Sequence, residues 1–303
     1  MGAGKIAITI GDPAGVGCEI IASLLAVRPD LRRACAVLAH ADFLRGLPDD
    51  VEKVPVGDSA YRAVLGAPDD EGARVAFAAL EEAAAGCAAG RYAAVVTAPI
   101  SKAQMRKVGF DFQGHTEFFA ARWGGTPVMS FAGEKIIVSL ATWHIPLRAV
   151  PDSLGEGKIA RAVAASETLA KKLRGAEVPR IAVCGVNPHA GEGGIIGGEE
   201  TEIINPILSR LRKKYAGLSE CLPPDTVFAR LLKGEFDCAV AMYHDQALAP
   251  LKAVEFDKAV NISMNLPFLR VSPDHGTAFS IAGKGIASSE SFARACELAM
   301  RLA

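Results

Sequence analysis

Short apolar runs alternate with longer amphipathic segments along most of the 303-residue chain. Each run has the length of a buried strand and is followed by a segment with the helical spacing of apolar residues. Strands that alternate with helices in this way form a largely parallel sheet with helices packed on it. The pattern therefore predicts an α/β protein, with strands in the runs at 5–10, 35–40, 93–100, 180–186 and 236–243.

One stretch departs from this alternation. Residues 127–142 contain two strand-like runs around Gly133 and Glu134, which predicts a β-hairpin. Hairpins within α/β enzymes often serve as arms at subunit interfaces, so this hairpin is a candidate interface arm. No internal repeat, low-complexity tract or long linker marks a domain boundary.

The composition excludes several classes of partner. Thirty-three basic and thirty-four acidic residues leave a net charge of −1, so we expect no nucleic-acid or membrane partner. The seven cysteines form no CxxC motif and several lie in apolar runs, as in a protein with reduced thiols in the cytoplasm. The first apolar stretch is interrupted by Asp12 and Pro13, and no later run reaches the length of a membrane span. We therefore expect neither secretion nor membrane insertion.

The histidines are the most informative residues. His40 follows an apolar run and is expected to be structural, whereas the other five lie in polar segments beside carboxylates, amides or hydroxyls. His144, His189 and His244 each follow a strand-like run, and in a parallel sheet such positions converge at the carboxyl edge. Three imidazoles there can bind a divalent cation and leave positions open for substrate, with Asp245 orienting one of them. The alternative is that each histidine is satisfied by a hydrogen bond in its own loop, since no compact HxxxH motif is present.

Basic and neutral hydrogen-bond donors form a second group. A guanidinium that binds two oxygens, a lysine charge and neutral donors are the combination that phosphate or carboxylate recognition needs. Arg270 ends an apolar run and is expected to begin a loop. The alternative is that Lys252 and Arg270 are solvated surface charges. The other members of the group are Ser101, Lys102, His115, Thr116 and Asn261.

Three glycine-rich segments are candidates for contact with ligands. GDPAGVG (11–17) is not GxGxxG, so a Rossmann dinucleotide fold is not predicted; its glycines permit either close strand–helix packing or phosphate contact. GVNPHAGEGGIIGGEE (185–200) is either a flexible wall of the active cleft or a plain surface loop. The third segment, HGTAFSIAGKGIASSES, begins at His275 with a backbone that can approach a ligand closely.

Seven motifs occur in order over nearly the whole chain: GDPAGVG (11–17), TAPISK (97–102), GHTEF (114–118), NPHAGEGG..G.EE (187–200), DTVF (225–228), YHDQ.L..LK (243–252) and VN....LPF.R.S.DHGTA (260–278). Together they resemble those of the 4-hydroxythreonine-4-phosphate dehydrogenase family of vitamin B6 biosynthesis. The segment HGTAFSIAGKGIA is also similar to the adenosine-binding loop of isopropylmalate and isocitrate dehydrogenases, which share the family's fold.

The resemblance implies an isocitrate/isopropylmalate dehydrogenase-like α/β/α fold, with two subdomains around a cleft. We expect a discontinuous nucleotide-binding subdomain, 1–125 plus 255–303, and a metal-binding and dimerisation subdomain, 126–254. The implied partner is a second copy of the chain, in a homodimer with a shared active site.

The resemblance also implies a role for individual residues. His144, His189 and His244 are the expected metal ligands for one Zn, Co, Mg or Mn ion, and the third would come from the partner subunit. The catalytic candidates are Lys102 and Asp245, with Lys102 or a metal-bound water as the base. The expected substrate-binding residues are His115, Thr116, Lys252, Asn261 and Arg270, and those expected to bind NAD or NADP are His275, Gly276, Thr277 and Ala278.

Three positions depart from the family pattern. The segment ALAPLK (247–252) stands where many members have GLPVLK, Asn265 stands where glycine is usual, and Cys18 replaces a common proline. The two glycine losses lie near expected substrate-binding residues. They bear on the exact substrate rather than on the class of reaction.

The function that follows is metal-dependent oxidation of the secondary alcohol of 4-phosphohydroxy-L-threonine by NAD(P), then decarboxylation to 3-amino-2-oxopropyl phosphate. One alternative is the same chemistry on another substrate, such as a phosphorylated tetronate or a dihydrodiol. An alternative of another class is a three-histidine metal hydrolase, which would need a glutamate base and no nucleotide loop. A binding module without catalysis would leave the metal and acid–base groups unused.

Overall fold

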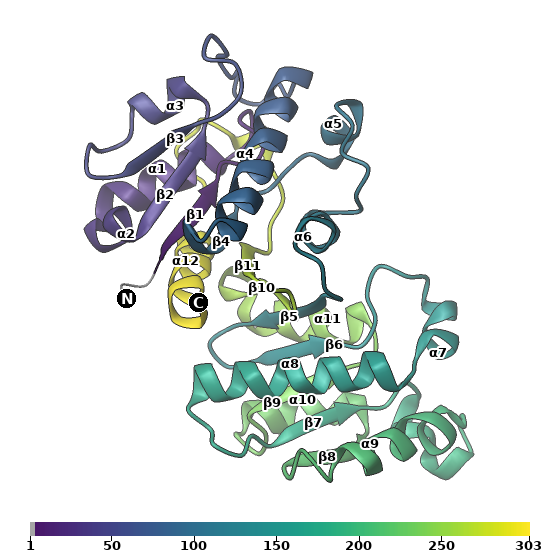
Figure 1. The fold of residues 1–303 in the computed structure, drawn as a ribbon. Coiled ribbons are helices and arrows are strands. Elements are labelled where there is room, and N and C mark those ends of the chain that lie inside the picture. Colours follow the sequence, from purple (N-terminus) through teal and green to yellow (C-terminus); the bar gives the residue numbers. More distant parts are fainter. Residues whose placement is uncertain (1–3) are drawn as a thin grey trace. The chain divides into compact units, whose positions relative to one another are not determined.

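The computed structural model describes residues 4–303, which form two compact units. The first unit contains the residues up to Pro127 together with Val260–Ala303, and the second contains Val128–Ala259. The sequence suggested boundaries at 125/126 and 254/255. Both units consist of strands covered by helices, so the predicted α/β class is confirmed (Figure 1). None of the helices in the described residues is long and apolar enough to cross a bilayer.

The strands of the first unit follow the order β3-β2-β1-β4-β11-β10. The first five run parallel, and β10 is antiparallel to β11. The strands are β1 (Lys5–Thr9), β2 (Cys35–Ala39), β3 (Glu52–Pro55), β4 (Tyr92–Thr97), β10 (Val260–Met264) and β11 (Leu269–Pro273). The helices are α1 (Gly17–Val27), α2 (Pro29–Ala34), α3 (Ala41–Arg45), α4 (Asp70–Ala88), α5 (Lys102–Lys107), α6 (His115–Trp123), the 3-10 turn η5 (Phe279–Ile281) and α12 (Glu290–Leu302).

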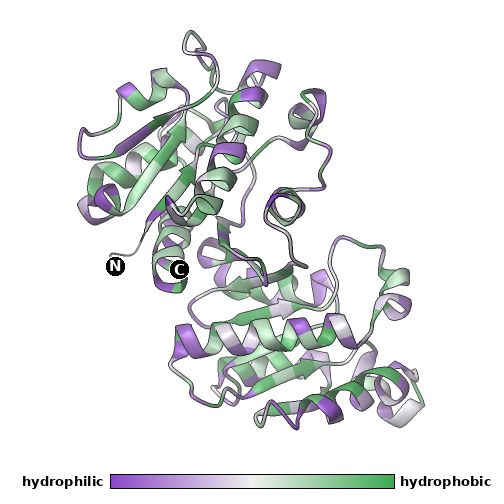
Figure 2. Ribbon diagram, in the orientation of Figure 1, coloured by the Kyte–Doolittle hydropathy of each residue, from purple (hydrophilic) through white to green (hydrophobic). Residues whose placement is uncertain are grey.

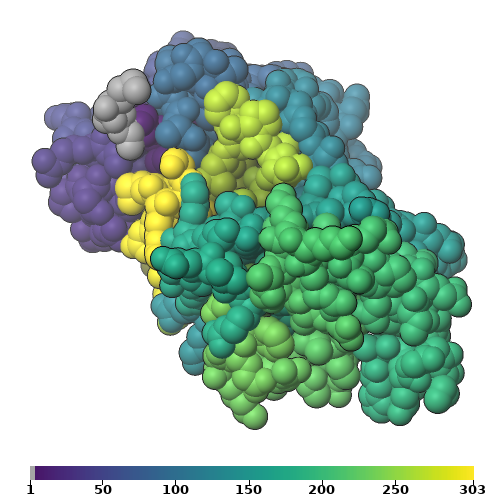
Figure 3. Space-filling view, turned by 60° about the horizontal axis from the view of Figure 1, so that its bottom comes forward, coloured from purple at the N-terminus to yellow at the C-terminus, as the bar shows by residue number. Residues whose placement is uncertain are grey.

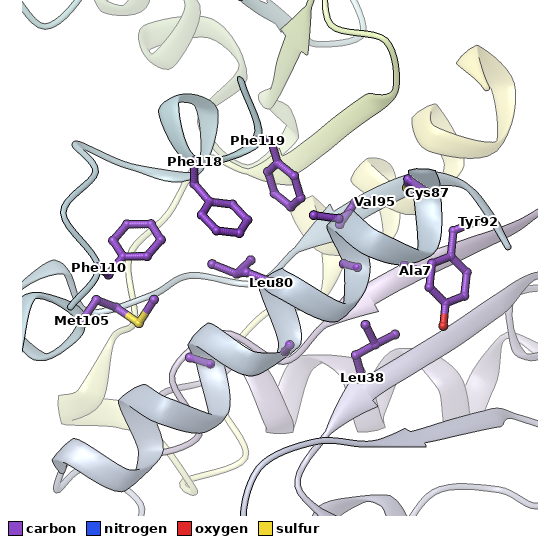
Figure 4. Packing of buried hydrophobic residues seen from close by; sticks show 14 of the residues in the cluster. Ala7, Leu38, Leu80, Cys87, Tyr92, Val95, Met105, Phe110, Phe118 and Phe119 are labelled. Atoms are coloured by element: carbon purple, nitrogen blue, oxygen red, sulfur yellow. The ribbon is translucent and has the colours of Figure 1, made fainter. Parts of the chain in front are cut away.

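The core of the first unit anchors the helix that carries His115. Figure 4 shows Phe118 and Phe119 of α6 packed over Leu80 of α4 and Val95 of β4, all of them buried. Aromatic side chains that bury this much apolar surface hold a short helix firmly in place. The C-terminal helix α12 packs against α1, and in Figure 3 it is the yellow segment beside the purple N-terminal region.

The strands of the second unit follow the order β5-β6-β9-β7-β8. Strands β6, β9, β7 and β8 run parallel, with α8 on one face and α10 and α11 on the other (Figure 1). Figure 2 shows apolar strands and helices that are polar on one side only, as expected for a sheet covered by amphipathic helices. The strands are β5 (Val128–Ala132), β6 (Ile137–Leu140), β7 (Ile181–Cys184), β8 (Leu218–Leu222) and β9 (Cys238–Ala241). The helices are η1 (Leu147–Ala149), α7 (Val150–Ser153), α8 (Glu156–Arg174), η2 (Pro188–Gly194), the π-helix η3 (Glu200–Ile204), α9 (Asn205–Leu211), α10 (Pro224–Leu232), α11 (His244–Glu255) and η4 (Phe256–Lys258).

The predicted hairpin is confirmed as the antiparallel pair β5 and β6. Its turn is fixed by the carboxylate of Glu255, which accepts the backbone N–H groups of Glu134 and Lys135 at 2.6 and 2.8 Å. Both strands are buried throughout, and β6 also pairs with β9. The hairpin is therefore an inner part of the sheet and not a projecting arm, so the expectation that it serves as an interface arm is wrong.

Candidate active site

The first unit contains a cavity of about 240 Å³ at the carboxyl ends of β4 and β11. Lys102, Arg270 and two histidines line it, and no aspartate or glutamate of the described residues does. Positive charge that is partly shielded from water attracts anions, because the solvent screens it weakly. The remaining lining residues are Thr97, Pro99, Ile100, Gly114, Ser272, Pro273 and Gly276.

Arg270 lies within strand β11, which corrects the expectation that it begins a loop. The strand forms because residues 269–271 pair with β4 on one side and residues 270–273 with β10 on the other. Side chains alternate along a strand, so Val271 enters the core while Arg270 and Ser272 face the cavity. The guanidinium is only 4% exposed, which excludes the interpretation of Arg270 as a solvated surface charge.

The hydrogen bonds of Arg270 within the protein leave two of its N–H groups for a ligand. Its Nε and Nη2 donate to Thr97 Oγ1 at 3.1 and 2.7 Å, and Nη1 donates to Asn261 Oδ1 at 3.0 Å. A guanidinium has five N–H groups, so one donor remains on each terminal nitrogen. Both acceptors are neutral, and burial lowers the pKa of Arg270. A buried cation with two N–H donors left over is suited to a phosphate or a carboxylate.

His115 and Thr116 begin helix α6 beside this arginine. The Nε2 atom of His115 is buried and has no hydrogen-bond partner in the described part of the chain. Burial, followed by the charges of Arg270 and Lys102, lowers the pKa of His115 well below its ordinary value. The imidazole is therefore neutral and can hydrogen-bond a ligand. Thr116 Oγ1 lies 2.9 Å from Ser263 Oγ of β10.

The loop expected to bind the nicotinamide cofactor reaches the same cavity. His275 and Gly276 line it, and Nε2 of His275 is buried without a partner in residues 4–303. The carbonyl of Thr277 accepts the N–H of Val16 at 3.0 Å, so this loop packs on the GDPAGVG segment. A Cβ at Gly15 would lie 2.7 Å from that carbonyl, so only glycine permits the contact. Ala278 follows with a left-handed backbone, at φ 48°.

Lys102 is placed by the start of helix α5. Ser101 is the N-cap, and its Oγ accepts the N–H of Gln104 at 3.4 Å. Lys102 is the first residue of the helix and lines the cavity. Because no acidic residue of the described chain lines this cavity, the amine of Lys102 is available to a ligand.

The three candidate metal ligands lie in the second unit, after three adjacent parallel strands in the order β6-β9-β7. The rings of His144 and His244 are neighbours, with centroids 5.6 Å apart. The Nδ1 atom of His244 lies 2.7 Å from the carboxylate of Asp245. If Asp245 accepts a hydrogen bond from Nδ1–H, Nε2 of His244 is left as the metal-binding nitrogen. Asp245 thus contacts a candidate ligand and is placed where it could orient that ligand.

The strand ends that carry these histidines are tied together by buried hydrogen bonds. Thr142 Oγ1 donates to the carbonyl of Met242 at 2.6 Å, which joins the ends of β6 and β9. Gln246 accepts the N–H of Met242 at 2.7 Å and donates to the carbonyl of Gly185 at 2.6 Å, which joins β9 to β7. A buried side-chain amide with both ends satisfied holds its neighbours rigidly. Sequence reasoning missed Gln246, although its position two residues after His244 on a helix end was a usable signal.

The side chain of His189 is not beside those of the other two histidines. It has a left-handed backbone, at φ 54°, and its exposed side chain lies 3.5 Å from a carboxylate oxygen of Glu192. Within the described residues, no group of three or more histidine, cysteine or acidic side chains is arranged to hold a metal ion. The chain by itself brings together two of the three expected ligands. Two imidazoles, one of them oriented by a carboxylate, are a donor set suited to a divalent transition metal.

Lys252 is the one expected substrate-binding residue that lies in the second unit. It is in helix α11, two turns beyond His244, with its Nζ 5.9 Å from the ring centroid of Phe256. The other four expected residues of this group lie together in the first unit. Thr97, Ser263 and Ser272 accompany them, and sequence reasoning had assigned none of these three a role.

The structure explains one departure from the family pattern. Asn265 has a left-handed backbone, at φ 59°, in the turn between β10 and β11. Asparagine tolerates this conformation better than other residues with a side chain. Its Nδ2 also donates to the carbonyl of Thr126 at 2.6 Å. Asparagine therefore replaces glycine by filling the same turn, and Asn265 is exposed rather than part of the cavity wall.

Comparisons with known proteins show which family this chain resembles over its length. The family model described as "Pyridoxal phosphate biosynthetic protein PdxA" matches residues 20–299. The 4-hydroxythreonine-4-phosphate dehydrogenase of Thioalkalivibrio sulfidiphilus is 41% identical, over 99% of this chain and 97% of the relative. A crystal structure of 4-hydroxythreonine-4-phosphate dehydrogenase from Klebsiella pneumoniae is 36% identical and has a TM-score of 0.85, with 99% of both chains covered.

More distant structures share the fold alone. A terephthalate 1,2-cis-dihydrodiol dehydrogenase from Burkholderia xenovorans is 24% identical with a TM-score of 0.73, and covers 99% of this chain. A β-decarboxylating dehydrogenase from Thermococcus kodakarensis is 13% identical with a TM-score of 0.53, and also covers 99% of this chain. The expected isocitrate/isopropylmalate dehydrogenase-like fold is confirmed.

Proposed function

The chain belongs to the family of the pyridoxal phosphate biosynthetic protein PdxA and the 4-hydroxythreonine-4-phosphate dehydrogenases, and we propose that it oxidises 4-phosphohydroxy-L-threonine with a nicotinamide cofactor. The observation that supports this substrate best is the buried Arg270, with two donors unused in a cavity that no carboxylate lines. A phosphate group is the ligand that neutralises such a site. Glu117 and Asp274 interact with this charge from outside the cavity lining, and an anionic substrate group would contact it directly.

In the proposed complex the terminal phosphate binds Arg270 and the neutral His115. Thr97 and Asn261 hold the guanidinium in place through three of its N–H groups and leave two for the substrate. Lys252 is proposed as a further substrate contact, on the resemblance to the family alone. The side chains are fixed before substrate arrives, which lowers the entropic cost of binding.

The metal is proposed to be held by His144, His189 and His244. When bound, a divalent cation acts as a Lewis acid that lowers the pKa of the substrate hydroxyl and favours negative charge on its oxygen. Asp245 orients His244 for this role. Lys102 is the candidate base that takes the hydroxyl proton, because it lines the cavity and no acidic residue does.

The reaction removes a hydride from the carbon that carries the hydroxyl and a proton from the hydroxyl oxygen. NAD or NADP would supply the hydride acceptor and would be held by the loop His275–Ala278, where Gly276 leaves open space and Nε2 of His275 lacks a partner in the described chain. The product is a β-keto acid, which loses carbon dioxide to give 3-amino-2-oxopropyl phosphate. This would be a step of pyridoxal phosphate biosynthesis.

A second copy of the chain is proposed to complete the metal site, in a homodimer. The chain alone brings His144 beside His244 and leaves His189 apart from them. The loops after His144 and His189 continue into exposed aliphatic side chains, and Leu147 and Ile195 are 67% and 84% exposed. Large apolar side chains next to a functional site are typical of a surface that another subunit covers. We also place the enzyme in the cytoplasm, because all seven cysteines are free thiols.

A substrate panel tests the proposal. Reduction of NAD and NADP is followed with 4-phosphohydroxy-L-threonine, phosphoerythronate and phosphothreonate, in the presence of Zn²⁺, Co²⁺, Mg²⁺ or Mn²⁺. We expect turnover with the first compound to exceed that with the other two. Faster turnover of a phosphorylated sugar acid or a dihydrodiol would assign the chain to the same chemistry on another substrate. Phosphate release without reduction of the cofactor would favour a metal hydrolase.

A further inference from the structure

The carboxylate of Glu200 is buried beneath the loop that carries His189. Glu200 is fully buried at the start of the π-helix η3, and its Oε1 accepts the backbone N–H groups of Val186 and Asn187 at 2.6 and 2.8 Å. Its Oε2 accepts Nδ2 of Asn187 at 3.0 Å. These three donors are neutral and belong to Val186 and Asn187, the second and third residues after β7. The charge of Glu200 is thus used to fix the backbone that leads to His189.

The loop encloses this carboxylate without spare room. A Cβ at Gly185 would lie 2.9 Å from Oε1 of Glu200, and a Cβ at Gly191 would lie 2.6 Å from Oε2. Such distances are shorter than real contacts, so a side chain at either position would displace the carboxylate or the loop. The glycines of this segment therefore allow the backbone to wrap closely around one acidic side chain.

The enclosed backbone is strained. Residues 189–193 all have left-handed conformations, and three of them, His189, Ala190 and Glu192, are not glycine. L-residues rarely adopt this conformation unless the surrounding structure imposes it. The hydrogen bonds to Glu200 end at Asn187, two residues before His189. They fix the backbone that leads from β7 to His189.

We propose that Glu200 is a positioning residue for His189, which holds the strained loop so that the imidazole is presented to the metal. The proposal rests on the proposed role of His189 as a ligand. Glu200 does not act as a base, because its carboxylate is enclosed by the loop and occupied by three donors. Outer residues that orient metal ligands commonly alter metal affinity when they are replaced.

The test is a titration of the metal-stripped enzyme with Co²⁺, read by calorimetry and by the visible absorption of the bound ion. Glu200→Gln keeps the size of the side chain but offers an NH₂ group to N–H donors. We expect it to weaken Co²⁺ binding by about 10- to 100-fold and to shift the absorption toward that of His189→Ala. Glu202→Gln makes the same charge change on an exposed residue nearby and should match the wild type. Wild-type affinity and absorption in Glu200→Gln would overturn the proposal.

The variants Gly191→Ala and Gly193→Ala provide a second test in case Glu200→Gln does not fold. Gly191 and Gly193 have similar backbones, at φ 76° and 68°, but a Cβ at Gly193 has no atom within 4 Å. Gly191→Ala should weaken Co²⁺ binding several-fold more than Gly193→Ala, because only the former collides with Glu200. Equal affinities in the two variants would contradict the proposal. Wild-type binding by His189→Ala would instead show that His189 is not a ligand, which is a failure of the proposed function.

Discussion

Replacement of Arg270 by alanine tests the substrate assignment through a defined loss of contacts. Arg270 is buried, uses three of its N–H groups within the protein and has two left for a ligand. A charge-assisted hydrogen bond contributes about 1.5 to 3 kcal/mol, and about 1.4 kcal/mol corresponds to a tenfold change. We therefore expect Arg270→Ala to raise KM for 4-phosphohydroxy-L-threonine by about 10- to 150-fold. The cofactor KM should change little.

The assay is the initial rate of nicotinamide reduction against substrate concentration. Arg33→Ala, which removes an exposed positive charge from α2, is the control for net charge. Arg270→Lys keeps a charge but cannot offer two parallel donors, so it should recover only part of the affinity. Loss of Arg270 also leaves Thr97 and Asn261 with an unused acceptor, so thermal unfolding must show that each variant is folded. A folded Arg270→Ala enzyme with an unchanged substrate KM would refute the reasoning.

Three further predictions concern the histidines. His144→Ala or His189→Ala should lower metal affinity and turnover by orders of magnitude while the fold persists, and full activity of His189→Ala would contradict the metal assignment. If the site is shared, mixed and refolded His189→Ala and His244→Ala chains should regain about a quarter of the wild-type rate, since half the dimers are mixed and each has one complete site; no recovery in proven heterodimers would exclude a site in which the partner supplies His189 or His244. The same experiment with His144→Ala and His244→Ala should give no recovery if the partner supplies His189, and with His144→Ala and His189→Ala no recovery if it supplies His244. The pKa of His115 is lowered in the folded state, so the unfolded state binds more protons below about pH 6.5. The free energy of unfolding should therefore fall as the pH decreases below this value, and it should fall less in His115→Gln. Equal pH dependence of the two proteins in denaturant unfolding would contradict this.

Much of the fold could be predicted because strand and helix patterns are local properties of the sequence. The strands at 260–264 and 269–273 escaped prediction for a physical reason. Asn261 pairs with Ser272 and Ser263 with Arg270, so every second residue is polar, and Arg270 and Ser272 face the cavity instead of an apolar core. Strands that line a binding site do not look like core strands. The same pairing explains why Arg270 was expected in a loop.

The candidate site was predictable in its residue types but not in its geometry. The rule that ligands bind at the carboxyl ends of parallel strands pointed to His144 and His244, and the structure places their rings side by side. The direction of His189 could not be predicted, because it depends on a run of left-handed residues held by a buried carboxylate. The role of Thr97 also required the structure, since only strand register brings its hydroxyl to Arg270.

The central claim is that the chain oxidises and decarboxylates a phosphorylated amino acid. The most direct measurement supplies the purified enzyme with 4-phosphohydroxy-L-threonine labelled in its carboxylate, a divalent metal and NAD or NADP, and counts reduced cofactor, labelled carbon dioxide and inorganic phosphate. We predict reduced cofactor and carbon dioxide in a one-to-one ratio, with no release of phosphate and no reaction in the presence of a chelator. Phosphate release in place of cofactor reduction, or no consumption of this substrate by the metal-loaded enzyme, would contradict the account.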